Sequence, residues 1–302
     1  MPSLKEIKGR IGSVKSTLKI TSAMKLVASA KLRKAQQTIE GMRPYEMKLQ
    51  EILARVMEQA GAASFSGAYA RTEPQNASEE GETAAKQKIA LVAFASNSSL
   101  CGAFNANVVR LALETLRSYE NADVTVYSVG RKMAESMKKV GKPSPADYQK
   151  LADKPAYASA AELAESLMEA YREGRLDRVD LVYNHFVSSG KQVPVRETLL
   201  PMGEIPSGVI PSEAKESDIE YILEPSAAEL LEDLIPKSLR LKFYTALLDS
   251  NASEHAARTV AMQTATDNGE DLLQELTLQY NKGRQQKITS EILDLAGGSQ
   301  EQ

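Results

Sequence analysis

An apolar repeat with alternating steps of three and four residues runs through the N-terminal segment. It starts at Leu4, Ile7, Ile11, Val14 and Leu18, and the same register later meets Leu32, Ala35, Ile39, Met42, Leu49, Leu53 and Val56. Such a heptad seam is typical of a helix that packs along a second helix. A helix from about Leu4 to Val56 would be roughly 80 Å long, which exceeds one compact domain of this size. Pro44 should bend this helix or loosen one turn.

The C-terminal third carries a second long helical pattern, which includes AAELLEDLIPKSLRLKFYTALLDS and EDLLQELTLQYNKGRQQKITSEILDL. A long helix at each end predicts an antiparallel coiled coil, because the chain must return between them. Pro236 predicts a helix start or a kink. Between the two patterns, SNASEHAARTVAMQTATDN (250–268) has almost no large apolar residue, so its neighbour cannot be an ordinary core.

The middle third changes to a mixed pattern. The runs KIALVAFA, DVTVYSVG, VDLVYNHFV and VPVRETLLPM predict strands, with helical segments between the first three. Strands that alternate with helices indicate a small Rossmann-like α/β domain with a largely parallel sheet. The predicted fold class is therefore α/β, with a long antiparallel coiled coil of the N- and C-terminal helices. The expected parts are a first helix (1–60), a mobile linker (61–86), the α/β domain (87–202), a connecting segment (203–225) and a last helix (226–302).

Composition and charge narrow the classes of function. The 302 residues are 42% hydrophobic and 25% charged, which is typical of a globular chain. The sequence has no apolar run of the roughly 20 residues that span a bilayer. Its first 34 residues carry nine lysines and arginines against one glutamate, so this basic arm has a charge of +8 within a net charge of −3. It could meet nucleic acid, an acidic protein surface or anionic lipid, or remain a solvated helix face.

The polar turn SNSSLCGAFN follows the first predicted strand, where some α/β folds bind nucleotides. It lacks the glycine-rich phosphate motifs and has no nearby lysine. We therefore expect a helix cap rather than a cofactor site, made by one of Ser96, Asn97, Ser98 and Ser99.

Residues suited to metal binding or covalent chemistry are few. His185 and His255 have no cysteine or carboxylate cluster at ligand spacing, which argues against a metal site. Cys101 is the single cysteine and is expected to be a small buried residue without redox function. The sequence therefore predicts no catalytic residues, no cofactor and no metal.

Specific motifs occur in order along the whole chain: ITSAMKLVASAKLRKAQ with RPYE, then SLCGAFN, then SEHAARTVAMQTATDN and LTLQYNKGRQQKITSEI. Together they resemble the gamma subunit family of F-type ATP synthases. The resemblance implies a non-catalytic rotor shaft that couples rotation of a membrane ring to ATP synthesis or hydrolysis at beta-subunit sites, and that regulates ATPase activity and proton flow.

The same resemblance implies partners and a location. The partners would be three alpha and three beta subunits, the epsilon subunit and the membrane c-ring, with no nucleic acid and no direct small-molecule substrate. The location would be peripheral, on the cytoplasmic side of a bacterial inner membrane. The basic arm would be attracted to an acidic lever loop of the beta subunits.

Carried over to this sequence, the resemblance implies that five residues contact the beta subunits or support coupling: Met24, Arg258, Gln285, Thr289 and Glu291. Arg258 would bind carboxylates or a carbonyl of a beta loop, and Gln285 would hydrogen-bond to the same kind of loop. The alternative for Arg258 is a weak pair with Glu254 on its own helix. Small side chains in 250–268 would let the two helices approach closely and would keep the shaft from locking in one position.

Two other classes of protein remain open on the residues alone. A nucleic-acid-binding coiled-coil protein would use the basic arm on phosphates, and its DNA complex would be sensitive to salt. A small α/β enzyme would need a site in the middle domain, where the phosphate-binding glycines are missing.

Overall fold

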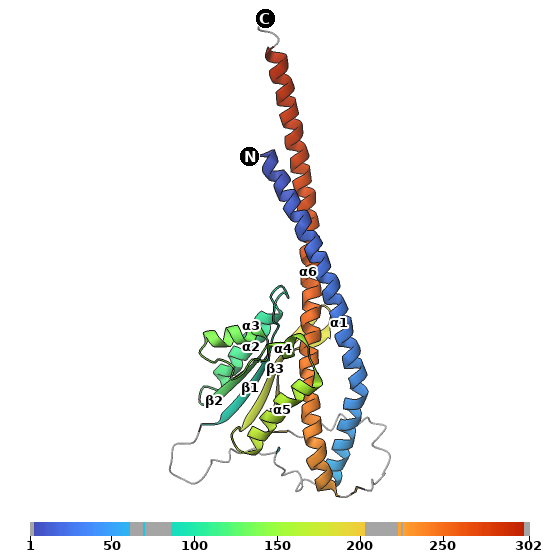
Figure 1. Cartoon of the computed structure of the whole chain (residues 1–302), viewed down its shortest axis with the longest axis vertical. Coiled ribbons are helices and arrows are strands. Elements are labelled where there is room, and N and C mark those ends of the chain that lie inside the picture. The colour runs from blue at the N-terminus through green and yellow to red at the C-terminus, as the bar shows by residue number, and fades with distance from the viewer. Residues whose placement is uncertain (1–2, 61–68, 70–85, 203–222, 225, 299–302) are drawn as a thin grey trace. The chain divides into compact units, whose positions relative to one another are not determined.

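The computed structural model describes residues 3–60, 69, 86–202, 223–224 and 226–298 (Figure 1). The expected linker and connecting segment therefore lie outside the described residues, apart from residues 69, 86, 223 and 224. The chain divides into two compact units, which we call the shaft unit (Met1–Ala30 with Arg258–Gln302) and the base unit (Lys31–Ala257). Each long helix contributes to both units.

The two long helices predicted from the sequence are confirmed. Helix α1 (Leu4–Ala60) has 57 residues and helix α6 (Ala227–Gly298) has 72. A reciprocal cap starts α1, because the Ser3 amide donates to Glu6 Oε2 at 2.9 Å and the Glu6 amide donates to Ser3 Oγ at 3.3 Å. This Ser-x-x-Glu capping box was readable in the sequence.

Of the two alternatives expected at Pro236, a helix start or a kink, the start is excluded, because Pro236 lies inside α6, which begins at Ala227, next to the predicted bound of 226. The Ser226 hydroxyl accepts a hydrogen bond from the Glu229 amide at 3.3 Å and caps the true start. Proline removes one backbone hydrogen bond from a helix interior. Burial of Leu231, Ile235 and Leu239 on this part of α6 offsets that loss.

The base unit contains a four-stranded sheet in the order β2-β1-β3-β4. Strand β1 pairs in parallel with β2 and β3, whereas β4 pairs antiparallel with β3. The prediction of a largely parallel sheet therefore holds for β1, β2 and β3. Strand β4 lies at one edge of the sheet and forms an antiparallel hairpin with β3. The bounds are β1 Lys88–Phe94, β2 Asp123–Val129, β3 Arg178–Ser188 and β4 Lys191–Leu200.

Helices cover both faces of this sheet. In β1, Ile89, Leu91 and Ala93 share a buried cluster with residues of α2 (Phe104–Ser118) and α3 (Arg131–Lys139). The alternate β1 residues share a second cluster with α5 (Tyr157–Arg172) and with the part of α6 in the base unit. Burial on both faces explains why this strand reads as a continuous apolar run. The short helix α4 (Gln149–Asp153) was not predicted.

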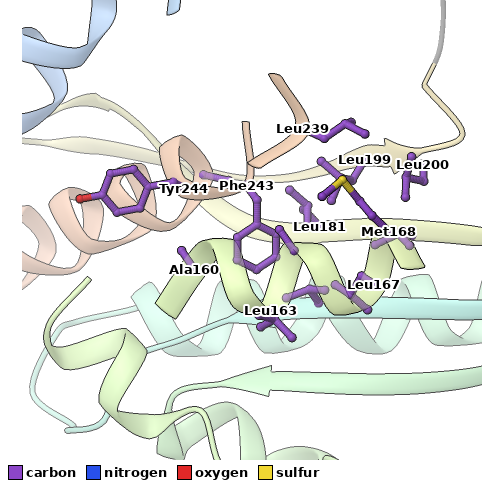
Figure 2. Close-up of a cluster of buried hydrophobic side chains, with 14 of the residues drawn as sticks. Ala160, Leu163, Leu167, Met168, Leu181, Leu199, Leu200, Leu239, Phe243 and Tyr244 are labelled. Atoms are coloured by element: carbon purple, nitrogen blue, oxygen red, sulfur yellow. The ribbon is translucent and has the colours of Figure 1, made fainter. Parts of the chain in front are cut away.

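Figure 2 shows the second cluster, where Leu163 and Leu167 of α5 and Leu181 of β3 gather around Phe243 of α6. The ring centroids of Phe94 and Phe243 are 5.6 Å apart in an edge-to-face arrangement. The base part of α6 is therefore anchored by large apolar side chains.

Candidate functional site: the helix pair of the shaft unit

The seam predicted for α1 is the buried face of that helix in the shaft unit. Ile7, Thr21 and Ala28 are buried, and the positions between them in the heptad register are half-buried: Ile11, Val14, Leu18 and Lys25. Residues between the register positions, such as Lys5 and Lys19, are exposed. The heptad interpretation is therefore confirmed, including its small and mixed middle part.

Helix α6 supplies the other half of the seam in antiparallel orientation. Thr266 Oγ1 lies 2.9 Å from Thr21 Oγ1, and Lys25 Nζ donates to Gln263 Oε1 at 2.7 Å. A Cβ added at Gly269 would lie 2.7 Å from Leu18 Cδ2. As the residue number falls along α1 it rises along α6, which confirms the predicted antiparallel pair.

Small residues set the distance between the two helices. Thr21 and Thr266 are 8% and 7% exposed, and Ala28 is 1% exposed. These side chains are short, and one hydroxyl pair stands where most coiled coils have a leucine contact. This explains why 250–268 can be helical with so few large apolar residues.

The outer face of the shaft unit differs from its seam. Large apolar side chains are exposed on both helices: Ile20, Leu26, Val27, Leu272, Leu278, Ile288, Ile292 and Leu293. Val260, at 44% exposure, is a further residue of this kind and lies within 250–268, so the small side chains expected for that stretch do not free the outer face of large apolar residues. Exposed apolar surface of this extent is typical of a segment that a partner covers.

The end of α6 has no helix beside it in the described part of the shaft unit. A Cβ added at Gly283 would lie 3.1 Å from Leu4 Cδ2, so Gly283 is level with the first residue of α1. From Arg284 to Leu293 every side chain is exposed, including Ile288 at 46% and Ile292 at 59%. The apolar spacing of Ile288 and Ile292 was the sequence signal for this face, and the five residues implied by the resemblance do not include either of them.

The five residues implied by the resemblance fall into two groups. Gln285, Thr289 and Glu291 lie in the exposed end of α6, where Thr289 Oγ1 donates to the Gln285 carbonyl at 2.9 Å. Glu291 pairs with Lys287 on the same helix at 3.6 Å. Met24 is half-buried and Arg258 is only 8% exposed. The structure therefore brings together the three C-terminal residues, whereas Arg258 is buried in this chain and was expected to face outward.

The basic arm is largely exposed. In the shaft unit, five of its cationic side chains face solvent: Lys5, Lys8, Arg10, Lys15 and Lys19. Lys25 differs, because it is half-buried and hydrogen-bonded to Gln263. The exposed cations form a positive surface on α1 that is available to an acidic partner.

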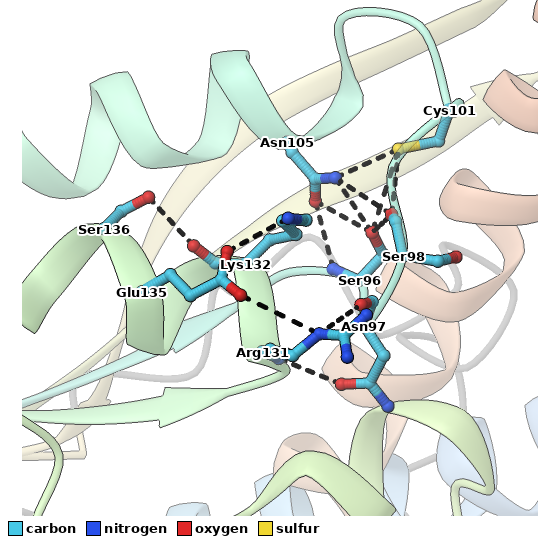
Figure 3. Close-up of polar contacts among 9 residues, drawn as sticks. All are labelled: Ser96, Asn97, Ser98, Cys101, Asn105, Arg131, Lys132, Glu135 and Ser136. Atoms are coloured by element: carbon cyan, nitrogen blue, oxygen red, sulfur yellow. Dashed lines mark hydrogen bonds and ion pairs between the residues drawn. The ribbon is translucent and has the colours of Figure 1, made fainter.

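The polar turn after β1 is a structural device of the base unit (Figure 3). It does not cap α2, whose N-cap Ala103 makes no side-chain hydrogen bond. Instead, Asn97 Oδ1 accepts from the amide of Arg131, the first residue of α3, at 2.9 Å. The expected cap is thus made on a different helix, because α3 follows the neighbouring strand β2 and starts at the same edge of the sheet.

The buried members of this turn bond to one another. Ser96 is fully buried and its amide donates to Asn105 Oδ1 at 3.1 Å. Asn105 Nδ2 lies 3.1 Å from Cys101 Sγ, and Cys101 is 1% exposed, which confirms its assignment as a small buried residue. With these polar atoms already bonded to each other, the turn offers a ligand little beyond its exposed rim.

The chain combines a pair of long helices with a small α/β domain, and its candidate contacts lie on exposed helix faces. This arrangement is typical of a subunit that acts by contact with other proteins. The family model described as ATP synthase matches residues 3–300, and the chain therefore belongs to this family. A relative from Bacteroides fragilis named "ATP synthase gamma chain" is 51% identical over 304 residues, which cover 99% of each chain. Gamma chains are the non-catalytic rotor subunits of this complex, as expected from the sequence.

Solved structures share the fold. The rotor of the Euglena gracilis mitochondrial ATP synthase contains a chain with a TM-score of 0.60 and 20% identity, with 94% of this chain and 98% of that chain covered. A chain of the OSCP/F1/c-ring structure from the same organism has a TM-score of 0.62 and 21% identity, with 98% and 93% covered. The predicted fold class is confirmed.

Membership of this family places the chain in a membrane-associated complex. No helix in the described ranges is long and apolar enough to cross a membrane. The family match supports neither a nucleic-acid-binding protein nor a small α/β enzyme, because it extends over the basic arm and the middle domain alike.

Proposed function

We propose that the shaft unit works inside a sleeve of three alpha and three beta subunits, while epsilon and the membrane c-ring drive the chain from its other end. Rotation of the chain would then couple proton flow to ATP synthesis or hydrolysis at beta-subunit sites, and would regulate both. The proposed location is peripheral, on the cytoplasmic side of a bacterial inner membrane. The chain alone would hydrolyse no ATP.

The exposed end of α6 carries this proposal. Ile288, Ile292 and Leu293 are 46%, 59% and 65% exposed on a helix segment without a neighbouring helix in the described shaft unit. Leaving such side chains in water forgoes roughly 25 cal/mol per Å² of apolar surface. Apolar contact is also non-directional, so a surrounding wall could cover these side chains in several rotational positions.

Charge and seam chemistry support the same role. The exposed cations of the basic arm would be attracted to acidic loops of the beta subunits at a range of positions, because charge attraction demands little geometric fit. The narrow seam of Thr21, Ala28 and Thr266 keeps the pair thin enough to turn inside a sleeve.

The proposed contact residues take roles that match their burial. Gln285, Thr289 and Glu291 are exposed and would contact beta-subunit loops directly. Met24 would contribute a half-buried apolar contact. Arg258, at 8% exposure, would support coupling mainly by holding the shaft and would reach a beta loop only through part of its guanidinium.

The test is a double substitution, Ile288→Asp with Ile292→Asp, in the assembled complex. Charged groups placed against an apolar wall should lower ATP-driven proton pumping per ATP hydrolysed, because each desolvated charge weakens contact with the wall by about tenfold or more, which is about 1.4 kcal/mol. The matched control is Val140→Asp, since Val140 is 49% exposed in the base unit. Pumping equal to that of the parent in the double variant, with normal assembly, would refute this placement.

A further inference from the structure

Polar side chains of α6 bond to the α/β domain on two sides of the helix within the base unit. They form two pairs, Arg240 with Lys242 and Asp249 with Asn251, and the members of each pair are two residues apart in the sequence. Because a helix turns by about 100° per residue, the two members lie on nearly opposite sides of α6. The same geometry puts Arg240 and Asn251 on one side, which we call the first flank. It puts Lys242 and Asp249 on the other side, which we call the second flank.

The first flank is bonded to two helices of the α/β domain. Arg240 Nη1 donates to Glu165 Oε1 of α5, and Asn251 Nδ2 donates to the Ala152 carbonyl of α4 at 3.2 Å. Both helices come between β2 and β3 in the chain. The first flank therefore joins α6 to the helical part of the domain.

The second flank is bonded to the hairpin of β3 and β4. Lys242 Nζ donates to the Thr198 carbonyl at 3.1 Å and pairs with Glu197 at 2.9 Å. Asp249 Oδ1 accepts from the Phe186 amide at 2.8 Å. The second flank therefore joins α6 to the edge of the sheet.

These polar contacts restrict a motion that apolar packing restricts less. Phe243 and Leu247 of the same helix segment lie in the buried cluster, but apolar contact is non-directional. A hydrogen bond, in contrast, weakens steeply with distance and angle. Turning α6 by about 30° about its own axis would move the surface of a helix about 10 Å wide by roughly 3 Å, which is enough to break such bonds.

We propose that the two flanks hold α6 against rotation about its own axis relative to the α/β domain, so that a turning force on this domain reaches the shaft unit through α6. Arg240, Lys242, Asp249 and Asn251 are then positioning residues, which act through the orientation of α6. The transmission of force rests on the proposed function, whereas the resistance of α6 to rotation does not.

The first test measures the orientation of α6 in the full-length chain. Spin labels are attached to cysteines that replace Glu232 of α6 and Glu114 of α2, which are both exposed, in a chain with Cys101→Ser. Pulsed electron paramagnetic resonance gives the distribution of distances between the two labels. The parent should give one narrow distribution.

The first flank is removed by Arg240→Glu with Asn251→Ala. The distance distribution should broaden by roughly 3 Å, because α6 is then held from one side only. Adding Glu165→Arg restores the ion pair with its charges exchanged and should narrow the distribution again. Arg240→Gln with Asn251→Ala should also broaden it, and it replaces the charge reversal if circular dichroism shows a loss of helical content.

The matched control is Lys237→Glu, which reverses another charge of α6 in the base unit. Lys237 pairs with Asp233 at 3.7 Å within the same helix and not with the α/β domain. This variant should keep the narrow distribution of the parent. The proposal is overturned if the first-flank variants stay as narrow as the parent, if Glu165→Arg does not restore the distribution, or if Lys237→Glu broadens it equally.

The second test measures protons pumped per ATP hydrolysed in the assembled complex. This ratio should fall about twofold or more in the first-flank variant, since each lost hydrogen bond shifts the balance between turning and slipping by about fivefold. It should recover with Glu165→Arg and stay at the parent value in Lys237→Glu. A normal ratio in a variant with a broadened distribution would overturn the transmission of force. Failure of the proposed function would differ, because the parent complex itself would then pump no protons.

Discussion

The sheet of the base unit and the helix pair of the shaft unit are built from different side chains. In the base unit, Phe94, Leu181 and Phe243 are at most 1% exposed, and both faces of β1 are covered. In the shaft unit, the seam contains Thr21, Ala28 and Thr266, while large apolar residues lie on the outside. The first region buries its apolar surface within the chain, whereas the second leaves much of it to a partner.

The energies of these contacts differ accordingly. Burying one leucine or phenylalanine side chain contributes about 1.5 to 3 kcal/mol. A threonine pair contributes only the net value of a hydrogen bond, about 0.5 to 1.5 kcal/mol. We therefore expect the base unit to hold most of the folding stability of the chain and the shaft unit to depend on its sleeve.

The largest expected effect is that of Asp180→Asn in the base unit. Asp180 is fully buried and accepts from Tyr119 Oη at 2.5 Å and from the Nε atoms of Arg178 and Arg196 at 2.9 Å each. Burial of Tyr119 raises its pKa to about 12, and the hydrogen bond to Asp180 and the negative charge of Asp180 act in the same direction. Removing the buried charge should cost about 3 kcal/mol or more.

Urea unfolding followed by near-ultraviolet circular dichroism of the tyrosines measures this loss. Asp123→Asn is the control, because Asp123 begins β2 and is exposed. A loss below about 1 kcal/mol for Asp180→Asn would mean that the base unit does not hold the stability assigned to it.

The next effect comes from Gly130→Ala, also in the base unit. Gly130 has φ +99°, and an added Cβ would lie 2.0 Å from the Ala95 carbonyl oxygen. Backbone atoms cannot give way as a side chain can, so we expect a loss of about 3 kcal/mol. Gly141→Ala is the matched control, since its φ is +75° but nothing lies within 4 Å of an added Cβ. Thermal unfolding measures both losses of stability. Equal losses in the two variants would show that the positive φ, and not the contact with Ala95, causes the effect.

Much of this architecture was predictable from the sequence, because it follows from periodicity. The seam from Ile7 to Ala28 and the four strands were identified by the spacing of apolar residues alone. The burial of Arg258 was not, since it depends on what packs against α6 from distant parts of the chain. Asn97 was one of four residues expected to cap a helix, but the sequence did not identify α3 as that helix, because the contact joins the ends of two strands that are neighbours only in the sheet.

Gly269→Ala in the shaft unit should have a small effect on stability, in contrast to Gly130→Ala in the base unit. Its added Cβ would meet Leu18 Cδ2, the end of a half-buried and flexible side chain. Alanine also favours a helix over glycine by about 1 kcal/mol, so the net change should be within about 1 kcal/mol. Gly269→Leu should instead overpack the seam by about 1 to 3 kcal/mol. Helical content against temperature measures both, and a large loss for Gly269→Ala would show that the seam is packed as rigidly as the base unit.

The smallest effect concerns two glutamates of α1, and its sign depends on pH. Burial raises the pKa of Glu46 in the folded chain, so the folded state holds this proton more tightly than the unfolded state, whose ordinary value is 4.5. Stability therefore falls as the pH rises through the interval between 4.5 and the folded pKa, and the penalty is complete above it. Glu46→Gln should raise the melting temperature near pH 7 by an amount equivalent to less than about 1 kcal/mol, because water still screens a partly buried carboxyl.

Glu51 should respond with the opposite sign. Its hydrogen bond from Lys48 lowers its pKa, so its contribution to stability is present above 4.5 and is lost as the pH falls through the folded pKa. Glu51→Gln should therefore lower the melting temperature near pH 7, and both variants should converge on the parent at acidic pH, where the parent carboxyls are protonated. If Glu46→Gln were instead destabilising at pH 7, the attraction of nearby cations for the carboxylate would outweigh its burial.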